Sequence, residues 1–590
     1  MSETADQMLP SRWNSLIFGA KAAVFRGRRT LHELRRRPPL HPRADALRDA
    51  PVIAEIRSPL WLGPSGAAEH DLTAGKIHNL RLAVRALDGV EVPAGAVFSF
   101  WRQVGRATRR RGFVAGRELR EGCLVASTGG GLCQLSNGLY EAALAAGFEI
   151  VERHAHSRVV PGSRAVAGRD ATVFWNYVDL RFRSAAPFRI EARLTAAELE
   201  IRFRSTADPA SGIVVPFPAA RDVAHDCIGC AHESCIRHIP AGAVVTRTPT
   251  AWLVDGSWPE YVAVMRAQAG PEDRLFLPMR WPARARYAWP ELAGGETRAT
   301  LVALARARTV RRLPAVGGAL PRAMLEFDRR LAESYARRLP HRYTHLVVGQ
   351  GLLPHLWRLG CLQGRSFDVL MERWPLAALQ ARLDRALARH PQSATLGDFR
   401  APDDIVAAEA EALAAASRLY TPHGGIAARF PGRAVHLDWA FPDMAARRPR
   451  IGGRTVVFPA SALGRKGAHA LRDAVDGLDI DLVVTGRASE PDDPFWRNVS
   501  VRKLPAGPWP DPIAAVVLPA IVEHQPRALL RAIALGLPVI ATPACGLDKG
   551  RGVTLVPEDD ATALREALLQ ALGDAPRARQ AAQGSARNSA

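Results

Sequence analysis

The residues best suited to covalent chemistry lie in and just after a glycine-rich block, Gly129–Gly131. Cys133 follows this block. Glycines before a cysteine at the start of a helix expose backbone N–H groups, which lower the pKa of a thiol and can form an oxyanion-binding site. His154 and His156 follow as candidate bases for a Cys–His nucleophile, with Gln134 as a candidate oxyanion donor. Three interpretations stay open here: catalysis, binding of a ligand without chemistry, and packing of a structural thiol.

A second group of candidate residues lies where a strand-like apolar run ends and a helical pattern begins. Arg465, Lys466 and Gly467 follow the run 455–458 and precede the helical run 468–476. Backbone N–H groups and the helix dipole at such a junction bind phosphates, and a cation can complete the site. The pattern therefore predicts a nucleotide-diphosphate site. A solvated lysine at a helix start is the alternative for Lys466.

Glu523 follows the apolar run 516–518 in a similar way, and His524, Gln525 and Arg527 lead into the next helical run. A carboxylate at a strand-to-helix junction can accept hydrogen bonds from sugar hydroxyls, while the N–H groups behind it face a diphosphate. We therefore expect these four residues to contact a nucleotide-sugar donor. An ordinary loop carboxylate is the alternative for Glu523.

Three thiols and three imidazoles are concentrated between His225 and His238. Cys227 and Cys230 form a Cys-x2-Cys chelating turn, and Cys235 with His238 would complete the tetrahedral coordination of a structural zinc ion. An iron–sulfur cluster and free or redox-active thiols are the alternatives, since the sequence contains no second Cys-x2-Cys pair.

The segments around these residues differ in their apolar spacing. Residues 51–206 mix helical spacing with short extended runs, which predicts an α+β domain. From residue 241 onward, short apolar runs alternate with alanine-rich helical stretches, as in parallel α/β domains. In the first region we predict helices at 76–87 and 136–146 and strands at 173–177, 180–183 and 199–203. In the second region we predict strands at 344–348, 367–371, 455–458, 482–484, 514–518 and 538–541.

A break rich in arginine and proline, Phe441–Arg450, divides the α/β region into two lobes. A chain of 590 residues is also too long for one hydrophobic core. The predicted order of segments is a basic leader and linker (1–50), an α+β domain (51–206), a Cys- and His-rich connector (207–240), a first α/β lobe (241–445), a second α/β lobe (446–575) and a tail (576–590).

The chain carries a formal net charge of +21, and most of its basic residues are arginines. They are dispersed along the chain and no nucleic-acid-binding motif accompanies them, so we expect no specific nucleic-acid partner. A basic surface favours anionic partners such as nucleotide diphosphates, lipid phosphates or a membrane face. The hydrophobic share of 47% and the charged share of 23% are those of a soluble globular protein.

The N-terminal segment contains one short apolar stretch, Leu16–Phe25, which Lys21 interrupts. A secretion signal needs a longer uninterrupted apolar region, and no run of about 20 apolar residues exists that could span a bilayer. Seven cysteines, an odd number, also argue against a secreted disulfide framework. We therefore expect a cytoplasmic protein. Its basic N-terminal segment is either an amphipathic helix in peripheral contact with an anionic membrane or a disordered, solvated leader.

The block Gly129–Tyr140, together with His154–Ser157 and Gly168–Thr172, resembles the VanW family, which is named from a vancomycin-resistance cluster. Residues in Pro93–Phe100 and Val104–Phe113 fit the same family. The resemblance spans residues 78–183. It implies the family's fold rather than a defined reaction.

The segment 453–572 resembles the C-terminal lobe of retaining GT-B glycosyltransferases of the GT4-like group. The matching features are Lys466–Gly467, Pro519 followed by Glu523, and the run Ala532–Thr542. The resemblance implies a GT-B fold of two Rossmann-like lobes, in which an acceptor lobe precedes a lobe that binds the nucleotide sugar.

Two positions depart from the pattern of that group. Ser461 stands where the family usually carries an arginine, although Arg465 could substitute for it from a different place. Arg531 stands where the family usually carries a second carboxylate, which contacts the ribose of the nucleotide. Both departures bear on the identity of the donor and on activity itself.

Together these features predict a VanW-like domain fused to a glycosyltransferase of the hexosyltransferase type, which moves a sugar from a nucleotide-sugar donor to an acceptor. By family analogy the acceptor is a cell-envelope precursor, lipid-linked or of the peptidoglycan type, or a surface polysaccharide. The alternative is a non-catalytic binding or scaffold protein of envelope metabolism with degenerate transferase lobes, which Ser461 and Arg531 favour. A third interpretation is amide or ester chemistry that depends on Cys133.

Overall fold

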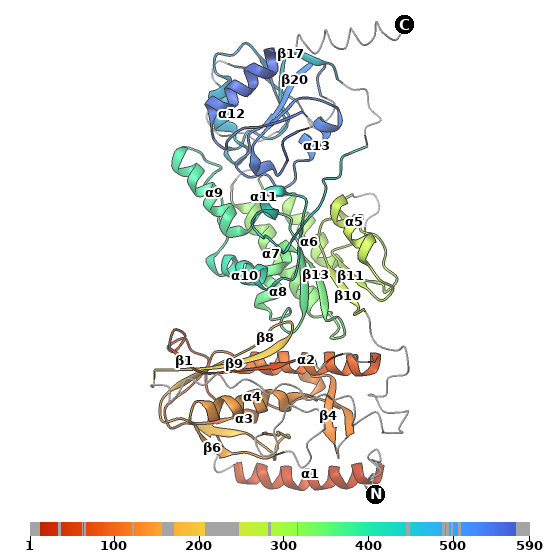
Figure 1. The fold of residues 1–590 in the computed structure, drawn as a ribbon, viewed down its shortest axis with the longest axis vertical. Helices are drawn as coiled ribbons and strands as arrows, with labels where there is room; N and C mark the ends of the chain where they lie inside the picture. The colour runs from red at the N-terminus through yellow and green to blue at the C-terminus, as the bar shows by residue number, and fades with distance from the viewer. Residues whose placement is uncertain are drawn as a thin grey trace. The chain divides into compact units, whose positions relative to one another are not determined.

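The computed structural model of the chain describes residues 12–33, 37–61, 63, 66–120, 123–155, 170–206, 247–280, 285–314, 317–443, 449–486, 490, 495–496, 499–504, 509–550 and 552–573. These residues form two compact units, one made mainly of residues up to Pro249 and the other of most of the residues after it (Figure 1). The first unit is an α+β domain and the second contains two α/β lobes, as the sequence predicted.

The first unit is built on antiparallel sheets. Its main sheet has the strand order β1-β9-β8-β2, which are Val52–Pro59, Glu198–Ser205, Phe188–Leu194 and Val90–Val92. A smaller sheet has the order β3-β7-β6, which are Val97–Ser99, Arg181–Arg183 and Glu149–Glu152. The hairpin β4–β5 joins Ala115–Arg120 to Cys123–Thr128. The helices that contact this framework are α2 (Ala67–Leu87), α3 (Phe100–Val104) and α4 (Leu132–Ala145).

Phenylalanine side chains fill the core of the first unit. Phe148 stacks on Phe203 with 5.5 Å between the ring centroids, and Phe188 lies 4.6 Å from Phe148. Each buried ring contributes about 1.5–3 kcal/mol to folding. Gly138 lets α4 approach β9 closely, because a Cβ at this position would lie 2.5 Å from the side chain of Ile201.

The first unit differs from the sequence prediction at residues 173–177. Its N-terminal segment is helical over Arg12–Glu33 (α1), where the sequence left a helix and a solvated leader as alternatives. Residues 173–177 are not a strand, because the chain turns there and closes with an isolated bridge between Phe174 and Val178. The predicted helices at 76–87 and 136–146 fall on α2 and α4.

The first lobe of the second unit has a seven-stranded sheet with the order β12-β11-β10-β13-β14-β15-β16. Its strands in chain order are Thr250–Leu253, Arg274–Leu277, Glu296–Arg298, His345–Gly349, Ser366–Leu370, Leu419–Thr421 and Ala434–His436. Its helices α5 to α11 are Pro259–Gln268, Thr300–Val310, Ala319–Ala336, Leu353–Arg358, Leu376–Arg389, Asp403–Ala415 and Gly424–Ala427. The strands predicted at 344–348 and 367–371 are β13 and β14, each displaced by one residue.

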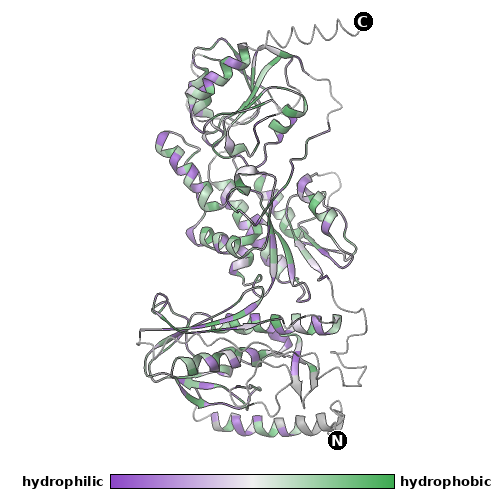
Figure 2. Ribbon diagram, in the orientation of Figure 1, coloured by the Kyte–Doolittle hydropathy of each residue, from purple (hydrophilic) through white to green (hydrophobic). Residues whose placement is uncertain are grey.

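The second lobe has a six-stranded sheet with the order β19-β18-β17-β20-β21-β22, in which every neighbouring pair is parallel. Its strands in chain order are Ile451–Phe458, Asp481–Val484, Ser500–Lys503, Ile513–Leu518, Val539–Ala541 and Val553–Leu555. Helix α12 (Ala468–Val475) follows β17 and helix α13 (Arg527–Ala534) follows β20. Every residue of β20 is buried, as expected for a central strand covered on both faces, and Figure 2 shows the hydrophobic colour in this sheet.

Two orders of strands define the fold of the second unit. In each sheet the second and third strands in chain order lie on one side of the first strand, and the later strands lie on its other side. This is the Rossmann order. Two such lobes in one chain are the GT-B arrangement that the sequence predicted. Within the part of the chain that the structure describes, no helix is both long enough and apolar enough to cross a membrane.

Candidate functional site

Two strand-to-helix junctions of the second lobe meet at the carboxyl edge of its sheet. β17 leads through the short helix η4 (Gly464–Lys466) into α12, and β20 leads through a loop into α13. β17 and β20 are neighbours in the sheet although β18 and β19 lie between them in the chain. Sheets of this order bind ligands at the reversal point, because the two loops diverge there and leave a crevice.

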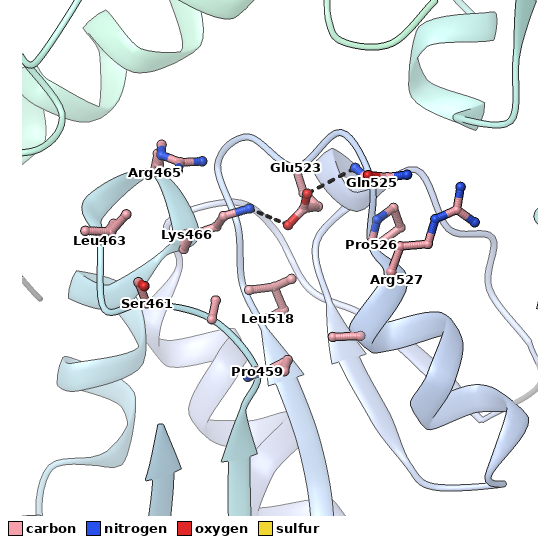
Figure 3. Close-up of a pocket in the computed structure, with 12 residues that line it drawn as sticks. Pro459, Ser461, Leu463, Arg465, Lys466, Leu518, Glu523, Gln525, Pro526 and Arg527 are labelled. Atoms are coloured by element: carbon pink, nitrogen blue, oxygen red, sulfur yellow. Dashed lines mark hydrogen bonds and ion pairs between the residues drawn. The ribbon is translucent and has the colours of Figure 1, made fainter. Parts of the chain in front are cut away.

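A cavity of about 270 Å³ lies between these two loops (Figure 3). Its lining residues are Pro459, Ala460, Ser461, Leu463, Arg465, Lys466, Leu518, Glu523, Gln525, Pro526, Arg527 and Ala528. The structure therefore brings together five of the residues predicted to bind the donor: Arg465, Lys466, Glu523, Gln525 and Arg527. The two other predicted residues, Gly467 and His524, are not among those that line it.

An ion pair between Lys466 and Glu523 joins the two sides of this cavity. Lys466 Nζ lies 2.5 Å from Glu523 Oε2, and Oε1 of the same carboxylate accepts hydrogen bonds from the backbone N–H groups of His524 and Gln525 at 2.9 and 3.1 Å. Burial alone would raise the pKa of Glu523, but the charge and hydrogen bond of Lys466 lower this pKa to about 2. Glu523 is therefore ionised at neutral pH, and its carboxylate can accept hydrogen bonds.

Gly467 lets the two loops approach each other. Its backbone has a left-handed φ of +79°, and a Cβ there would lie 1.8 Å from the carbonyl oxygen of Pro519. The N–H groups of Ile521 and Val522 donate to the carbonyl of Arg465 at 3.0 and 3.1 Å, which ties the loops together from the other side. Gly467 thus shapes the cavity through its backbone rather than by lining it.

Arg527 lines the cavity, but its guanidinium group is engaged elsewhere. It makes two hydrogen bonds of 2.7 and 2.6 Å to the carboxylate of Glu260 on α5, whose side chain is fully buried. The guanidinium also lies over the rings of Trp258 and Trp439, at 5.7 and 5.5 Å from their centroids. In Figure 3 it points away from the Lys466–Glu523 pair. Arg527 therefore joins the second lobe to the first.

His524 has a neutral imidazole. Burial lowers its pKa to about 3, and its buried Nδ1 atom has no hydrogen-bond partner among the described residues. His524 lies next to Glu523 in the loop but does not line the cavity. Its predicted contact with a donor stays a prediction.

The two positions that depart from the GT4-like pattern have different surroundings. Ser461 lines the cavity at the position where the family usually carries a cation. The guanidinium of Arg531 lies over the ring of Trp509, 4.7 Å from its centroid. The position of the family's second carboxylate is thus occupied by a cation packed on an aromatic ring.

The sequence interpretation missed a buried carboxylate that holds the loop after β17. Glu490 is 3% exposed and accepts hydrogen bonds from the N–H of Gly464 at 2.8 Å, from the N–H of Ala394 at 3.0 Å and from the hydroxyl of Ser393 at 2.9 Å. It therefore anchors the start of η4 to a loop of the first lobe. No local spacing pattern signals such a residue, because its partners lie far away in the sequence.

In the first unit, Cys133 lies in the first turn of α4. This helix begins directly after Gly131, which caps it with a φ of +99°. Its sulfur lies 3.5 Å from the hydroxyl of Thr172, and the N–H of Thr172 donates to the carbonyl of His154 at 2.8 Å. The imidazole of His154 is half exposed and lies 3.5 Å from a carboxylate oxygen of Glu152. The structure thus places the backbone of His154 near Cys133 and directs its ring to Glu152.

His156 lies outside the described residues. The Cys133, His154 and His156 chemistry therefore stays a prediction. The same applies to the metal site at Cys227, Cys230, Cys235 and His238, which falls entirely within an undescribed range. Among the described residues, no group of three or more His, Cys, Asp or Glu side chains could hold a metal ion.

Gln134 is engaged in a buried polar cluster with Lys76. Lys76 Nζ donates to the carbonyl of Leu60 at 2.8 Å and to the amide oxygen of Gln134 at 3.0 Å. The amide nitrogen of Gln134 donates to the hydroxyl of Ser58 and the carbonyl of Pro59, each at 2.9 Å. All strong hydrogen-bonding groups of the Gln134 amide are therefore used within the fold, which argues against Gln134 as an oxyanion donor.

Comparison with known families agrees with this division. Residues 75–204 match the family described as VanW like protein, and residues 454–574 match the family described as Glycosyl transferases group 1. The chain therefore carries a VanW-like domain and a group 1 glycosyltransferase domain.

Two bacterial relatives match part of the chain. The Bacillus subtilis protein YoaR is 34% identical over 160 residues, which cover 27% of this chain and 52% of that protein. The vancomycin B-type resistance protein VanW of Enterococcus faecalis is 36% identical over 114 residues, which cover 18% of this chain and 41% of that protein. The chain thus spans about half of the length of these relatives.

Several glycosyltransferases of known structure are similar to part of the chain. The sucrose-phosphate synthase of Thermosynechococcus elongatus has a TM-score of 0.37 at 15% identity and covers 56% of this chain and 91% of that protein. The lipopolysaccharide outer core galactosyltransferase WaaB, without ligand, has a TM-score of 0.33 at 12% identity over 56% of this chain and 91% of its own. Anabaena HepE, solved with UDP and glucose, has a TM-score of 0.31 at 12% identity over 56% and 90%.

Proposed function

We propose that this chain is a glycosyltransferase of the hexosyltransferase type that acts in the cytoplasm. It transfers a sugar from a nucleotide-sugar donor to a cell-envelope precursor, lipid-linked or of the peptidoglycan type, or to a surface polysaccharide. The observation that carries the proposal is the Lys466–Glu523 pair in a cavity at the reversal point of a parallel sheet. The group 1 transferase domain matched over residues 454–574 supports it.

The geometry suits a diphosphate and a sugar side by side. Lys466 uses one of the three N–H donors of its ammonium group for Glu523, which leaves two for phosphate oxygens. The first turns of α12 and α13 add backbone N–H groups and positive helix-dipole ends. Glu523 has about four acceptor positions and uses three of them, so one is left for a sugar hydroxyl.

Calorimetric titration of the full-length protein with UDP, GDP, ADP and TDP and with their sugars tests the donor site. We expect saturable binding of one nucleotide class, which Lys466→Ala and Glu523→Ala abolish. Lys503→Ala is the matched control, because Lys503 is an exposed lysine of the same lobe on β19 and lies outside the cavity. Binding that survives in both cavity variants, or that Lys503→Ala removes equally, would contradict the proposed site.

Hydrolysis or transfer of the bound nucleotide sugar distinguishes an enzyme from a scaffold. The non-catalytic alternative rests on Arg531, which packs on Trp509 at the position of the family's second carboxylate. We expect slow release of free sugar from the donor in the absence of acceptor, measured by chromatography, and loss of that release in Glu523→Ala. Nucleotide binding without any turnover would favour the scaffold alternative instead.

A separate reaction at Cys133 remains a second proposal for the VanW-like domain. Its thiol lies in the first turn of a helix after three glycines, and its hydroxyl neighbour Thr172 could orient a proton. Reaction of the full-length protein with iodoacetamide across a range of pH would report a lowered thiol pKa. Labelling of Cys133 only at alkaline pH would exclude an activated nucleophile.

A further inference from the structure

Helix α1 contacts the rest of the first unit mainly through charged side chains, and Phe25 also stacks on Tyr177 with 5.7 Å between the ring centroids. Arg29 makes two hydrogen bonds to the carboxylate of Glu152, at 3.0 and 2.7 Å, and one to Glu33 at 2.8 Å. Glu33 also pairs with Arg181, and Arg26 donates to the carbonyl of Trp175 at 2.7 Å. These contacts fix the rotation of the helix about its axis, because they all come from one side of it.

The opposite side of α1 is apolar and open to solvent. Val24 is 71% exposed and Leu31 is 69% exposed. They are seven residues apart, so they share one face of the helix, and this face is about 100° or more away from that of Arg26 and Arg29. Ala20, one turn before Val24, is exposed as well. The helix therefore directs Arg26 and Arg29 inward and leaves Val24 and Leu31 exposed, unlike a helix whose whole apolar face packs on a core.

The charges beside this apolar face are all positive. Lys21 and Arg28 lie one helical turn apart from Val24 and are exposed. Glu33 is the only acidic residue of α1, and its ion pairs to Arg29 and Arg181 turn it inward. An apolar stripe with cations beside it and no exposed carboxylate is complementary to a lipid surface with anionic headgroups.

We propose that α1 docks the first unit on the surface of an anionic lipid bilayer. Val24 and Leu31 enter the boundary between headgroups and acyl chains, while Lys21 and Arg28 contact lipid phosphates. The ion pairs of Arg29 hold the helix parallel to the face of the domain, so the whole unit attaches through one side. This docking is independent of the chemistry at Lys466 and Glu523, and either can hold without the other.

Co-sedimentation of the full-length protein with vesicles tests the docking. The vesicles contain phosphatidylcholine alone or mixed with phosphatidylglycerol. We expect binding to the mixed vesicles, weaker binding at high salt, and little binding to phosphatidylcholine alone. Removing each cation, in Lys21→Ala and Arg28→Ala, lowers the partition coefficient about fivefold. The double variant Val24→Asp/Leu31→Asp lowers it by more than about tenfold.

Leu301→Asp is the matched control, because Leu301 is a leucine on α6 that is 84% exposed and lies in the other unit. It should bind vesicles like the wild type. Val24→Ser/Leu31→Ser provides a second variant that changes no charge, and unchanged melting curves show that all variants fold. Equal binding to both vesicle types, or wild-type binding by the double variants, would overturn the proposal. A dimer in light scattering that Val24→Asp dissociates, with no vesicle binding, would overturn it in favour of self-association.

Discussion

In each unit of the chain, a glycine with a left-handed backbone conformation caps a helix beside a lysine, but the two lysines have different surroundings. In the first unit, Gly131 caps α4 and packs on the side chain of Lys76, which a Cβ at Gly131 would approach to 2.1 Å. In the second unit, Gly467 caps α12 directly after Lys466. Lys76 is buried against neutral oxygen atoms, whereas Lys466 faces a cavity and pairs with a carboxylate.

This difference separates a structural lysine from a binding lysine. Burial, with a smaller effect of the nearby Arg117 charge, lowers the pKa of Lys76 to about 7, so this amine is only partly charged at neutral pH. Its hydrogen bonds connect α2 to Leu60, the residue after β1, and to Gln134 of α4 rather than to a ligand. A glycine-rich turn beside a lysine therefore indicates an anion site only where the lysine side chain faces a cavity, as that of Lys466 does.

The largest effect is expected from Gly467→Ala. A Cβ would lie 1.8 Å from the backbone oxygen of Pro519, and φ of +79° is strained for alanine, so we expect a loss of more than about 4 kcal/mol in the free energy of unfolding. Gly477→Ala is the control, because Gly477 has φ of +69° but nothing within 4 Å of its Cβ position. That control should cost about 1–2 kcal/mol in urea denaturation. Equal losses would mean that the contact of Gly467 with Pro519 does not hold the loops together.

Lys76 predicts a pH dependence that is specific to the first unit. Its pKa falls from 10.5 to about 7 on folding. Between these values the unfolded chain holds a proton that the folded chain has released, so stability rises with pH by about 1.4 kcal/mol per unit. From pH 7.5 to 9.5 the gain is about 3 kcal/mol. Denaturation of wild type and Lys76→Met at several pH values measures it, and the variant should lack this component of the slope. Parallel slopes would show that Lys76 keeps its proton in the folded state.

The sequence predicted the α/β lobes because many of their strands are uninterrupted apolar runs bounded by loops and helices. The runs at 482–484 and 514–518 are β18 and β20, which are buried on both faces. The strands β10, β11 and β12 were not predicted, and β12 (Glu296–Arg298) has no apolar run that could have indicated it. The turn at 173–177 was predicted as a strand because it contains apolar and aromatic residues, but these pack on the core and form only an isolated bridge between Phe174 and Val178.

The candidate site was predictable where it depends on neighbours in the chain. Lys466 and Glu523 each follow a strand, and parallel strands bring such positions to one edge. The contacts of Arg527 with Glu260, and of Glu490 with Gly464, could not be predicted. They depend on how distant segments fold together, and a single sequence carries no spacing pattern for such pairs.

A double-mutant cycle sharpens the contrast between the two lysines. Lys466→Met and Glu523→Gln each leave a partly buried charge without its partner, so we expect a coupling of about 2 kcal/mol in urea denaturation. The pKa of Glu523 falls from 4.5 to about 2 on folding. Its contribution is therefore present above pH 4.5 and is lost as pH falls toward 2. The exposed pair Arg183–Glu149 is the control, and we expect no measurable coupling there because water screens the two charges. A similarly small value for the cavity pair would mean that water screens it.

The smallest effect on stability is expected at Arg531. Arg531→Ala removes the contact with Trp509 and should cost about 0.5–1 kcal/mol. Arg531→Glu restores a carboxylate where the GT4-like pattern places one for the ribose hydroxyls. If the nucleotide binds at Lys466 and Glu523, this variant should bind it up to about tenfold more tightly than Arg531→Ala, because one charged hydrogen bond contributes about 1.5 kcal/mol. Deoxyribonucleotides that lack the contacted hydroxyl should show no gain. Equal affinity of both variants for every nucleotide would place the ribose away from position 531 and leave Lys466 and Glu523 to hold the donor without it.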